Sequence, residues 1–537
     1  MMKKAIKKLL AALLAVAMVC AMAIPAFAYN PGETKEDLNT KHDYGAFQIF
    51  DGVISKDNET LSDVNWGQNI TEPDIFLANL KNDPTIGEKF ETAATAQDVL
   101  AVISQWSNSD DNSIAFARVV CSYLYPNADA KPEPVITDHT GGINIPKSGY
   151  YLIVDTSTFS DDDFYHAYNS FFLLNVPQTP YVVLVNHKVV KPTVEKEVYD
   201  NNDIGSTGGW GSSADHAINE PFQFRLIAKL PASENNGRAY DYYDKYTVCF
   251  NDTLSAGITF DNLDKVEIAN VDGGNPQVID AANYTPNKDG LPSSFKLSID
   301  DVKTCAAAAG LNLNNGATIT VTYTAHLNEN ATVNTANGSN TTDNKNSVFL
   351  QYSNNPRIST SLDKTTTSDV CVYTYQLNNT KYRDEVNENN KLEGAGFRLY
   401  SNEACNDEDE IKLKKNYDGT YSRDFSADAV GVLMLSNKDG QFNVKGLDAG
   451  TYYLKETNPP TGYSACPMIT VTIKANHTKD HVDLSGSTLS TTFVNKAGGT
   501  TLPSTGGIGT TIFYVVGGGL MVAAIVLLVT KKRMENK

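Results

Sequence analysis

The chain has 537 residues and a formal net charge of −19, with 63 acidic against 44 basic side chains. Such an acidic chain is repelled by nucleic acid, which excludes nucleic-acid binding as a main function and suits a soluble protein surface. The length exceeds what one hydrophobic core uses, so about three domains are expected between the two ends.

The N-terminal segment has the layout of a secretory signal. Four lysines within the first eight residues precede an apolar run over 9–24, and Ala26-Phe27-Ala28 places small residues where signal peptidase reads them. We therefore expect residues 1–28 to be a signal peptide that is cleaved after Ala28, and the mature protein to be secreted. The alternative, a membrane anchor, would need a longer apolar run of about 20 residues.

The remaining chain predicts a mainly β protein built from tandem immunoglobulin-like β-sandwich domains. Thr, Asn, Tyr and Val are plentiful, turn signals are frequent and helical heptads are absent. A first domain is expected over 29–190, with strands at 46–50, 149–154 and 181–185. One or two helices are expected within 93–122.

Two further domains are expected after the stiff connector Lys191-Pro192-Thr193. The middle domain covers 191–357, and its first and last strands are expected at 194–198 and 347–352. The last domain covers 358–497, opening with a strand at 370–375 and closing with one at 491–495. Residues 498–537 then hold a flexible stalk and a terminal anchor.

The terminal anchor has three parts. Leu502-Pro503-Ser504-Thr505-Gly506 comes first, an apolar stretch over about 512–529 follows, and Lys531, Lys532 and Arg533 end it. The apolar stretch is long enough to cross a bilayer as a helix, with the basic residues on the cytoplasmic side. This order resembles the cell-wall sorting signal of Gram-positive surface proteins. The resemblance implies that a sortase cysteine attacks the Thr505 carbonyl, releases Gly506 onward and passes Thr505 to an amine.

The last domain resembles the collagen-adhesin B-type (CnaB) domains. The resemblance rests on the segments Leu377–Lys381, Leu392–Tyr400, Tyr452–Tyr463 and Phe493–Asn495 in this order. It implies an isopeptide bond between Lys381 and Asn495, with Glu456 as the acid that promotes it. Burial would make the lysine amine neutral and nucleophilic and would keep the carboxyl protonated, so that the amide forms and ammonia leaves.

The middle domain resembles the CnaA-like domain of isopeptide-forming backbone pilins. Lys196 lies on its expected first strand, Asn346 begins its last strand, and Asp252 lies in the run Tyr246–Phe260 between them. The resemblance implies a Lys196–Asn346 isopeptide bond with Asp252 as the acid. Asp252 is also compatible with an ordinary turn, because Asn-Asp-Thr is good turn chemistry.

A polymer of such subunits needs an exposed lysine to accept the Thr505 acyl group. In sortase-assembled pilins this lysine ends a VxVYPK-type motif, and the matching run here is Val183–Lys188. Asn186-His187 replaces the Tyr-Pro of that motif. Lys188 is the expected acceptor and Lys191 the runner-up.

No cofactor or metal is expected, because the cysteines form no CxxC pair and the eight histidines form no HExxH or similar motif. An enzyme that acts on a separate substrate molecule is disfavoured for the same reason. The isopeptide chemistry would be a single turnover that the chain catalyses on itself. Cys405 and Cys466 fall in the same domain and could pair as a disulfide, or remain buried thiols.

Together these features resemble the backbone pilins that sortases assemble on Gram-positive cells. The resemblance implies a shaft subunit of a cell-wall-anchored fimbria, joined from Thr505 to a lysine of the next copy. Its expected partners are sortase, other copies of itself, and peptidoglycan or a basal pilin, with a host or neighbouring-cell ligand also conceivable. The alternative is a singly anchored adhesin or minor pilin, which would have no use for an acceptor lysine.

Overall fold

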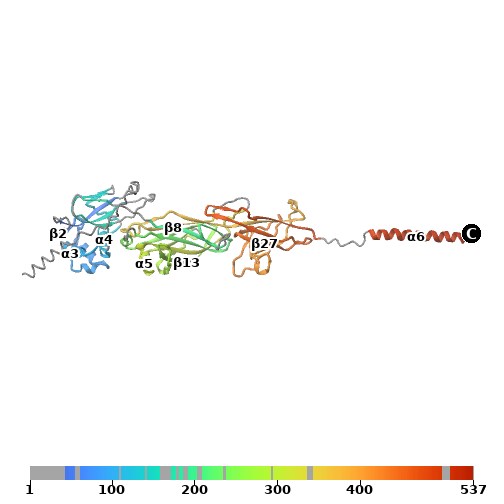
Figure 1. Cartoon of the computed structure of the whole chain (residues 1–537), viewed down its shortest axis with the longest axis horizontal. Coiled ribbons are helices and arrows are strands. Elements are labelled where there is room, and N and C mark those ends of the chain that lie inside the picture. The colour runs from blue at the N-terminus through green and yellow to red at the C-terminus, as the bar shows by residue number, and fades with distance from the viewer. Residues whose placement is uncertain are drawn as a thin grey trace, which may run out of the picture. The chain divides into compact units, whose positions relative to one another are not determined.

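The computed structural model describes residues 43–54, 61–107, 110–127, 129–138, 142–157, 171–176, 181–184, 191–201, 208–233, 238–291, 294–335, 343–498 and 508–535 (Figure 1). Contacts divide the chain into two compact units. Unit 1 contains the described residues up to Tyr375, together with Gly446–Ala449 and Lys474–Ser485. Unit 2 contains Gln376–Lys445, Gly450–Ile473 and the described residues from Gly486 onward. The predicted signal peptide, the LPSTG sequence and Lys188 lie outside the described residues.

The N-terminal part of unit 1 combines a β-sheet with helices. In sheet order the strands are β2 (Leu61–Trp66), β1 (Tyr44–Ile54), β5 (Gly149–Asp155) and β6 (Phe171–Val176), with β3 (Ile136–Asp138) beside β1. A separate pair consists of β4 (Gly142–Ile145) and β7 (Tyr181–Leu184). The helices are α2 (Pro73–Asn82), the 3-10 helix η2 (Gly87–Phe90), α3 (Ala96–Ile103) and α4 (Asp111–Leu124).

These helices bury one apolar face against the sheet. Phe76 of α2, Val99 of α3 and Phe116 of α4 share a core with Leu152 of β5, as expected for amphipathic helices. The strands and helices predicted for this region are present. Helix α2 was not predicted, although its first residue, Pro73, is a residue type favoured at helix starts.

The rest of unit 1 is a β-sandwich. One sheet runs in the order β14 (Gln277–Val278), β13 (Ile258–Asn270), β17 (Ala317–Leu327), β11 (Pro221–Leu230), β8 (Thr193–Asp200) and β9 (Gly209–Gly211). The other runs in the order β10 (Ser213–Asp215), β20 (Ser368–Tyr373), β18 (Lys345–Ser353), β12 (Val248–Leu254), β16 (Ser294–Ile299) and β15 (Thr285–Asn287), with β19 (Leu362–Lys364) beside β18. Shorter elements are η4 (Ala239–Tyr242), η5 (Ala281–Asn283), α5 (Val302–Ala308), η6 (Leu313–Asn315) and the pair β29 (Asn476–Thr478) and β30 (His481–Asp483).

Alternation along the strands builds the core of this sandwich. On β11, Phe222, Phe224 and Leu226 are buried while the residues between them are more exposed, because successive side chains of a strand point to opposite faces. They share one core with Phe250 of β12 and Leu350 of β18 in the facing sheet. Any polar residue at an inward position of these strands is therefore sealed from water.

Strand β20 was predicted to open the last domain, and this was wrong. It pairs antiparallel with β18, with Val370 opposite Asn346, and so lies in a sheet of unit 1. The chain enters unit 2 only with β21 (Tyr375–Arg383). The apolar pattern identifies a strand but not the sheet that receives it, because that choice depends on contacts with residues far away in the sequence.

Unit 2 has two sheets. One contains β23 (Leu413–Lys415), β24 (Tyr421–Arg423), β26 (Val444–Leu447), β21 and β31 (Ser490–Asn495). The other contains β25 (Met434–Leu435), β22 (Gly396–Tyr400), β27 (Gly450–Asn458) and β28 (Ile469–Ile473), and the connections include η7 (Glu388–Asn390) and η8 (Asp407–Asp409). Phe397 packs between the sheets, with ring centroids 4.1 Å from Phe442 and 4.8 Å from Phe493.

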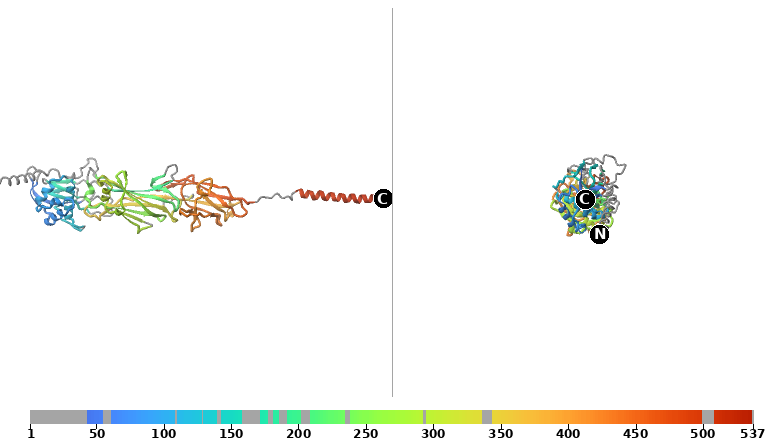
Figure 2. Two further views of the ribbon diagram at one scale, coloured as in Figure 1. Left: turned by 90° about the horizontal axis from the view of Figure 1, so that it is seen from below. Right: turned by 90° about the vertical axis from the view of Figure 1, so that its left-hand side faces the viewer.

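The C-terminal helix α6 (Ile508–Met534) begins just after the LPSTG sequence. Figure 2 shows it as one straight, uninterrupted helix. Its segment Phe513–Met534 is long and apolar enough to cross a membrane. The last turn carries Lys531, Lys532 and Arg533. This matches the order of apolar segment and basic tail predicted from the sequence.

Candidate functional site

The residues predicted for the isopeptide bond of the last domain come together in unit 2. Lys381 lies on β21, Asn495 ends β31, and Glu456 lies on β27 of the other sheet. β21 and β31 are neighbouring parallel strands, with Lys381 opposite Phe493. Leu377, Asn379 and Lys381 occupy alternate, buried positions on β21, so strand periodicity turns the lysine inward despite its charge.

One carboxyl group touches both of the other side chains in this cluster. Lys381 Nζ donates a hydrogen bond to Asn495 Oδ1 and lies 3.3 Å from Glu456 Oε2. Asn495 Nδ2 donates to Glu456 Oε1 at 2.8 Å. The backbone N–H of Cys466 donates to Glu456 Oε2 at 2.8 Å and so holds the carboxyl in place.

Apolar rings enclose the lysine amine. The side chains of Lys381 and Glu456 are both 0% exposed, and Lys381 Nζ lies 5.3 Å from the ring centroid of Phe397 and 5.9 Å from that of Phe493. An amine, an amide and a carboxyl within hydrogen-bonding distance therefore have the proximity that amide exchange requires.

The residues predicted for the middle domain also form a buried cluster, in unit 1. Lys196 lies on β8 of one sheet, whereas Asp252 on β12 and Asn346 on β18 belong to the facing sheet. Lys196 Nζ lies 2.5 Å from Asp252 Oδ1, and both side chains are 0% exposed. Asp252 shares the inward positions of β12 with Phe250. It is therefore a core strand residue, and the alternative of a turn residue is wrong.

Tyr323 of β17 completes this cluster and was not predicted from the sequence. Its hydroxyl donates to Asp252 Oδ2 at 2.5 Å and accepts hydrogen bonds from Lys196 Nζ at 3.1 Å and from Asn346 Nδ2 at 2.5 Å. The hydroxyl thereby connects the lysine, the acid and the asparagine. The sequence offers no signal for this role, because an inward tyrosine on a strand is usually an ordinary core residue.

Burial changes the acid–base properties of the unit 1 cluster. Removal from water lowers the pKa of Lys196 to about 8, against the opposing attraction of Asp252. Desolvation, together with the nearby Asp252 carboxyl, raises the pKa of Tyr323 well above its ordinary value. The tyrosine is thus a permanent hydroxyl, while the lysine is partly neutral, and hence nucleophilic, near neutral pH.

Cys405 and Cys466 are free thiols in the structure, so the disulfide considered between them is not formed. Cys405 Sγ lies 3.3 Å from Met468 Sδ. Cys466 Sγ lies 3.2 Å from Lys381 Nζ, and burial raises the pKa of the thiol to about 11. Each sulfur thus has another neighbour, and the reactivity of Cys466 is suppressed because the thiolate is the reactive form.

The predicted polymerisation residues are only partly within the described chain. Lys188, Thr505 and Gly506 lie outside it. Lys191, the runner-up acceptor, is partly buried, and its Nζ lies 3.9 Å from Asp363 Oδ2. Burial lowers the pKa of Lys191. An acceptor must reach a sortase active site, and this half-enclosed amine is less suited to that than a fully exposed one.

Two segments of the chain match known protein families. Residues 378–488 match the SpaA prealbumin-like fold domain, and residues 495–536 match the LPXTG cell wall anchor motif. The first match covers Lys381 and Glu456, and the second covers Asn495 and the LPSTG sequence. No curated protein is significantly similar to the chain.

Several solved structures are similar to parts of the chain. The 35 kDa C-terminal fragment of a major pilin of Streptococcus agalactiae is 21% identical, with 57% of this chain and 100% of that chain covered and a TM-score of 0.39. A backbone pilin of Streptococcus pyogenes is 17% identical, with 81% and 78% covered and a TM-score of 0.43. The full-length major pilin SpaD of Corynebacterium diphtheriae is 18% identical, with 70% and 86% covered and a TM-score of 0.39.

Proposed function

We propose that this cell-wall-anchored surface protein, a sortase substrate by its LPXTG anchor, is the repeating shaft subunit of a covalently polymerised pilus. The observation that carries the proposal is the buried Lys381–Glu456–Asn495 cluster. Its Lys381 and Asn495 lie on the neighbouring strands β21 and β31, which are far apart in the unit 2 sequence. A pilus shaft transmits tension through every subunit. A covalent bond between β21 and β31 would carry that tension without extending the residues between them.

The bond forms by exchange of one amide for another. Neutral Lys381 Nζ attacks Cγ of Asn495, the Cγ–Nδ2 bond breaks, and a Cγ–Nζ amide remains. Glu456 contacts both nitrogens, so it takes a proton from the attacking amine and gives one to the leaving ammonia. The new Cγ–Nζ amide carries no charge, whereas an uncompensated lysine charge in the core would cost on the order of several kcal/mol.

The unit 1 cluster performs the same reaction between the two sheets of the sandwich. Lys196 is the nucleophile, Asn346 the amide, and Asp252 the group that moves the proton. Tyr323 acts as a positioning residue, because its hydroxyl holds both the Asp252 carboxyl and the Asn346 amide. The finished bond would join β8 to β18 and prevent the two sheets from separating.

The rate of Lys196–Asn346 bond formation is expected to rise about 50-fold in total from pH 6 to pH 8 and to level off above this. The reason is that burial lowers the pKa of Lys196 to about 8, and the neutral amine fraction grows up to that value. To measure this, the chain is purified from inclusion bodies in denaturant and then refolded by dilution into buffers of different pH. Mass spectrometry then follows the linked peptide pair over time.

Asp252→Asn is the matched control for this measurement. The variant keeps the side-chain volume but cannot move a proton, so it should form almost no Lys196–Asn346 bond at any of these pH values. A rate that does not change between pH 6 and pH 8 would contradict the assignment of Lys196 as the nucleophile. A variant that reacts as fast as the parent chain would remove Asp252 from the mechanism.

Polymerisation is tested with the full chain, purified in detergent, and the pilus-type sortase of the same organism. The proposal predicts a ladder of products that survives boiling in SDS, because each joint is an amide between Thr505 and a lysine. A matched reaction with Thr505→Ala should give no ladder. If the wild-type chain yields only hydrolysed or singly transferred product, it is an anchored adhesin or minor pilin and not a shaft subunit.

A further inference from the structure

A second polar cluster lies in unit 1 and contains neither Lys196 nor Lys381. Its members are Asp200 at the end of β8, Asp215 of β10, His216 and Glu220 in the turn before β11, Asp448, and His477 of β29. All of them belong to unit 1, because the segments Gly446–Ala449 and Lys474–Ser485 pack there. Asp200, Asp215, His216 and Asp448 are each 5% exposed or less. The isopeptide chemistry uses none of these residues.

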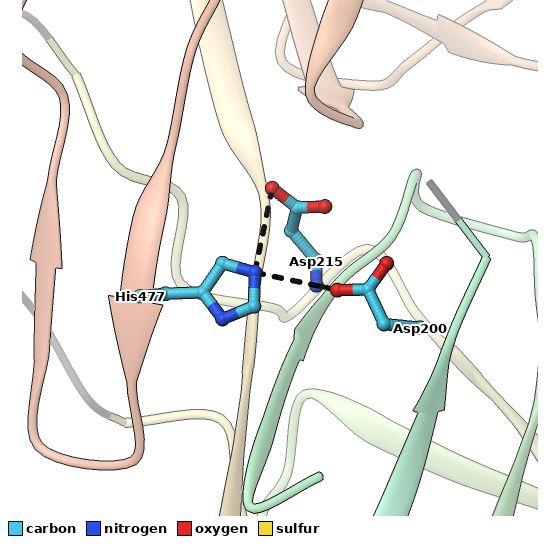
Figure 3. Close-up of side chains that lie close together, drawn as sticks. All are labelled: Asp200, Asp215 and His477. Carbon is cyan, nitrogen blue, oxygen red and sulfur yellow. Dashed lines mark hydrogen bonds and ion pairs between the residues drawn. The ribbon is translucent and has the colours of Figure 1, made fainter. Parts of the chain in front are cut away.

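In the half of the cluster formed by Asp200, Asp215 and His477, the side chains contact one another. His477 Nε2 lies 3.3 Å from Asp200 Oδ2 and 4.0 Å from Asp215 Oδ2 (Figure 3). Its other ring nitrogen, Nδ1, lies 2.9 Å from Ser213 Oγ. Asp215 Oδ2 also accepts a hydrogen bond from the Tyr375 hydroxyl at 2.8 Å. These contacts account for both nitrogens of His477 without a bound ligand.

The other half of the cluster contains a buried histidine nitrogen that makes no hydrogen bond. His216, Glu220 and Asp448 each place a candidate ligand atom within 4.8 Å of those of the other two. His216 Nε2 lies 2.7 Å from the Tyr199 carbonyl oxygen, so Nε2 carries the proton and Nδ1 carries the lone pair. Nδ1 is buried and has no hydrogen-bond partner.

The surroundings of His216 resemble those of a metal-binding histidine. Its ring stacks on Phe222, with centroids 4.2 Å apart and an interplanar angle of 3°, which fixes its orientation. A histidine that donates from one nitrogen to a carbonyl and leaves the other free is the usual arrangement of a metal ligand. A buried nitrogen without a partner otherwise costs about 1–3 kcal/mol.

The charges of the cluster also favour a cation. Four carboxyl groups lie together here, and two of them, Asp215 and Asp448, hydrogen-bond to each other. A divalent cation would supply the positive charge that these carboxylates lack.

We propose that His216 Nδ1, Glu220 and Asp448 bind one divalent transition-metal ion of the Zn²⁺ or Mn²⁺ type. The combination of one nitrogen and two carboxylate ligands favours a transition-metal ion. Imidazole nitrogen suits Zn²⁺ and similar ions, whereas Ca²⁺ and Mg²⁺ prefer oxygen ligands alone. The ion would tie Asp448 to the turn before β11, two segments far apart in the sequence. It would thereby stabilise unit 1.

The test is isothermal titration of the full-length, untagged chain after EDTA treatment and dialysis, in detergent. Zn²⁺, Mn²⁺, Ca²⁺ and Mg²⁺ chlorides are the probes. We expect one Zn²⁺ or Mn²⁺ ion per chain and at least tenfold weaker binding of Ca²⁺ and Mg²⁺. The bound ion should also raise the unfolding temperature of unit 1.

Two ligand variants and one control decide the assignment. Glu220→Gln and His216→Ala should each weaken binding at least tenfold, while Glu195→Gln, which removes the partner of Lys229 on β11, should leave it unchanged. If His216→Ala does not fold, Glu220→Gln decides, because Glu220 is only partly buried. No stoichiometric binding to the parent chain, tighter binding of Ca²⁺, or variants that bind as the parent does would each overturn the proposal.

Discussion

An Asn495→Ala variant is expected to lack one cross-link and to unfold unit 2 at a temperature about 20 °C below that of the parent chain. Asn495 and Lys381 are separated by 114 positions, and closing a loop of about this length stabilises a fold by roughly 4–5 kcal/mol. Intact mass spectrometry should find this variant about 17 Da closer to its calculated mass than the parent, because one ammonia is retained. Calorimetry gives the change in unfolding temperature.

Asn389→Ala is a suitable control for this experiment. Asn389 lies on η7 of the same unit and is exposed, so its replacement should alter neither the mass deficit nor the unfolding temperature beyond about 1–2 °C. A parent chain whose mass equals the calculated value would contradict the Lys381–Asn495 bond. Equal unfolding temperatures for Asn495→Ala and the parent would show instead that the bond adds no stability.

A Lys188→Arg variant is expected to abolish the polymer ladder that the wild-type chain forms with sortase. Arginine keeps the positive charge, but its guanidinium stays protonated and cannot attack the acyl-enzyme. Gel electrophoresis in SDS after the sortase reaction measures the effect. Isopeptide bonds within each chain should be unaffected, which intact mass checks in the same sample.

The matched control is Lys191→Arg. Lys191 is partly buried beside Asp363, so this variant should polymerise like the wild-type chain. A ladder that survives Lys188→Arg but disappears with Lys191→Arg would transfer the acceptor role to Lys191. A ladder that survives both changes would place the acceptor at another lysine.

Strand periodicity and family spacing predicted much of the unit 2 cluster. Lys381 falls on an inward position of β21 because alternate residues of a strand share a face. Glu456 and Asn495 were identified from short motifs in a fixed order, and the structure places both within hydrogen-bonding distance of Lys381 or its partner. The resemblance to CnaB domains supplied the three roles, and each residue lies on a strand that its own neighbours define.

The sheet that contains β20 and the role of Tyr323 could not be predicted from the local sequence pattern. Strand β20 has an apolar pattern typical of any buried strand, and only its pairing with β18 places it in unit 1. Tyr323 resembles any core tyrosine until its hydroxyl is seen between Asp252 and Asn346. Long-range packing decides both cases.

The proposed metal ligands illustrate the same limit. His216 and Glu220 are close in sequence, but Asp448 reaches them only because the segment Gly446–Ala449 packs in unit 1. No spacing rule connects ligands that come from such distant segments. Absence of a metal-binding motif in the sequence therefore did not exclude a site assembled by the fold.

If copies of this chain are joined to one another, tandem mass spectrometry of polymer released from the cell surface will detect the joint itself. After protease digestion, we expect a branched peptide in which the Thr505 carbonyl of one copy forms an amide with Lys188 Nζ of another. Finding Thr505 joined only to peptidoglycan peptides, with no branched peptide between copies, would contradict polymerisation of this chain.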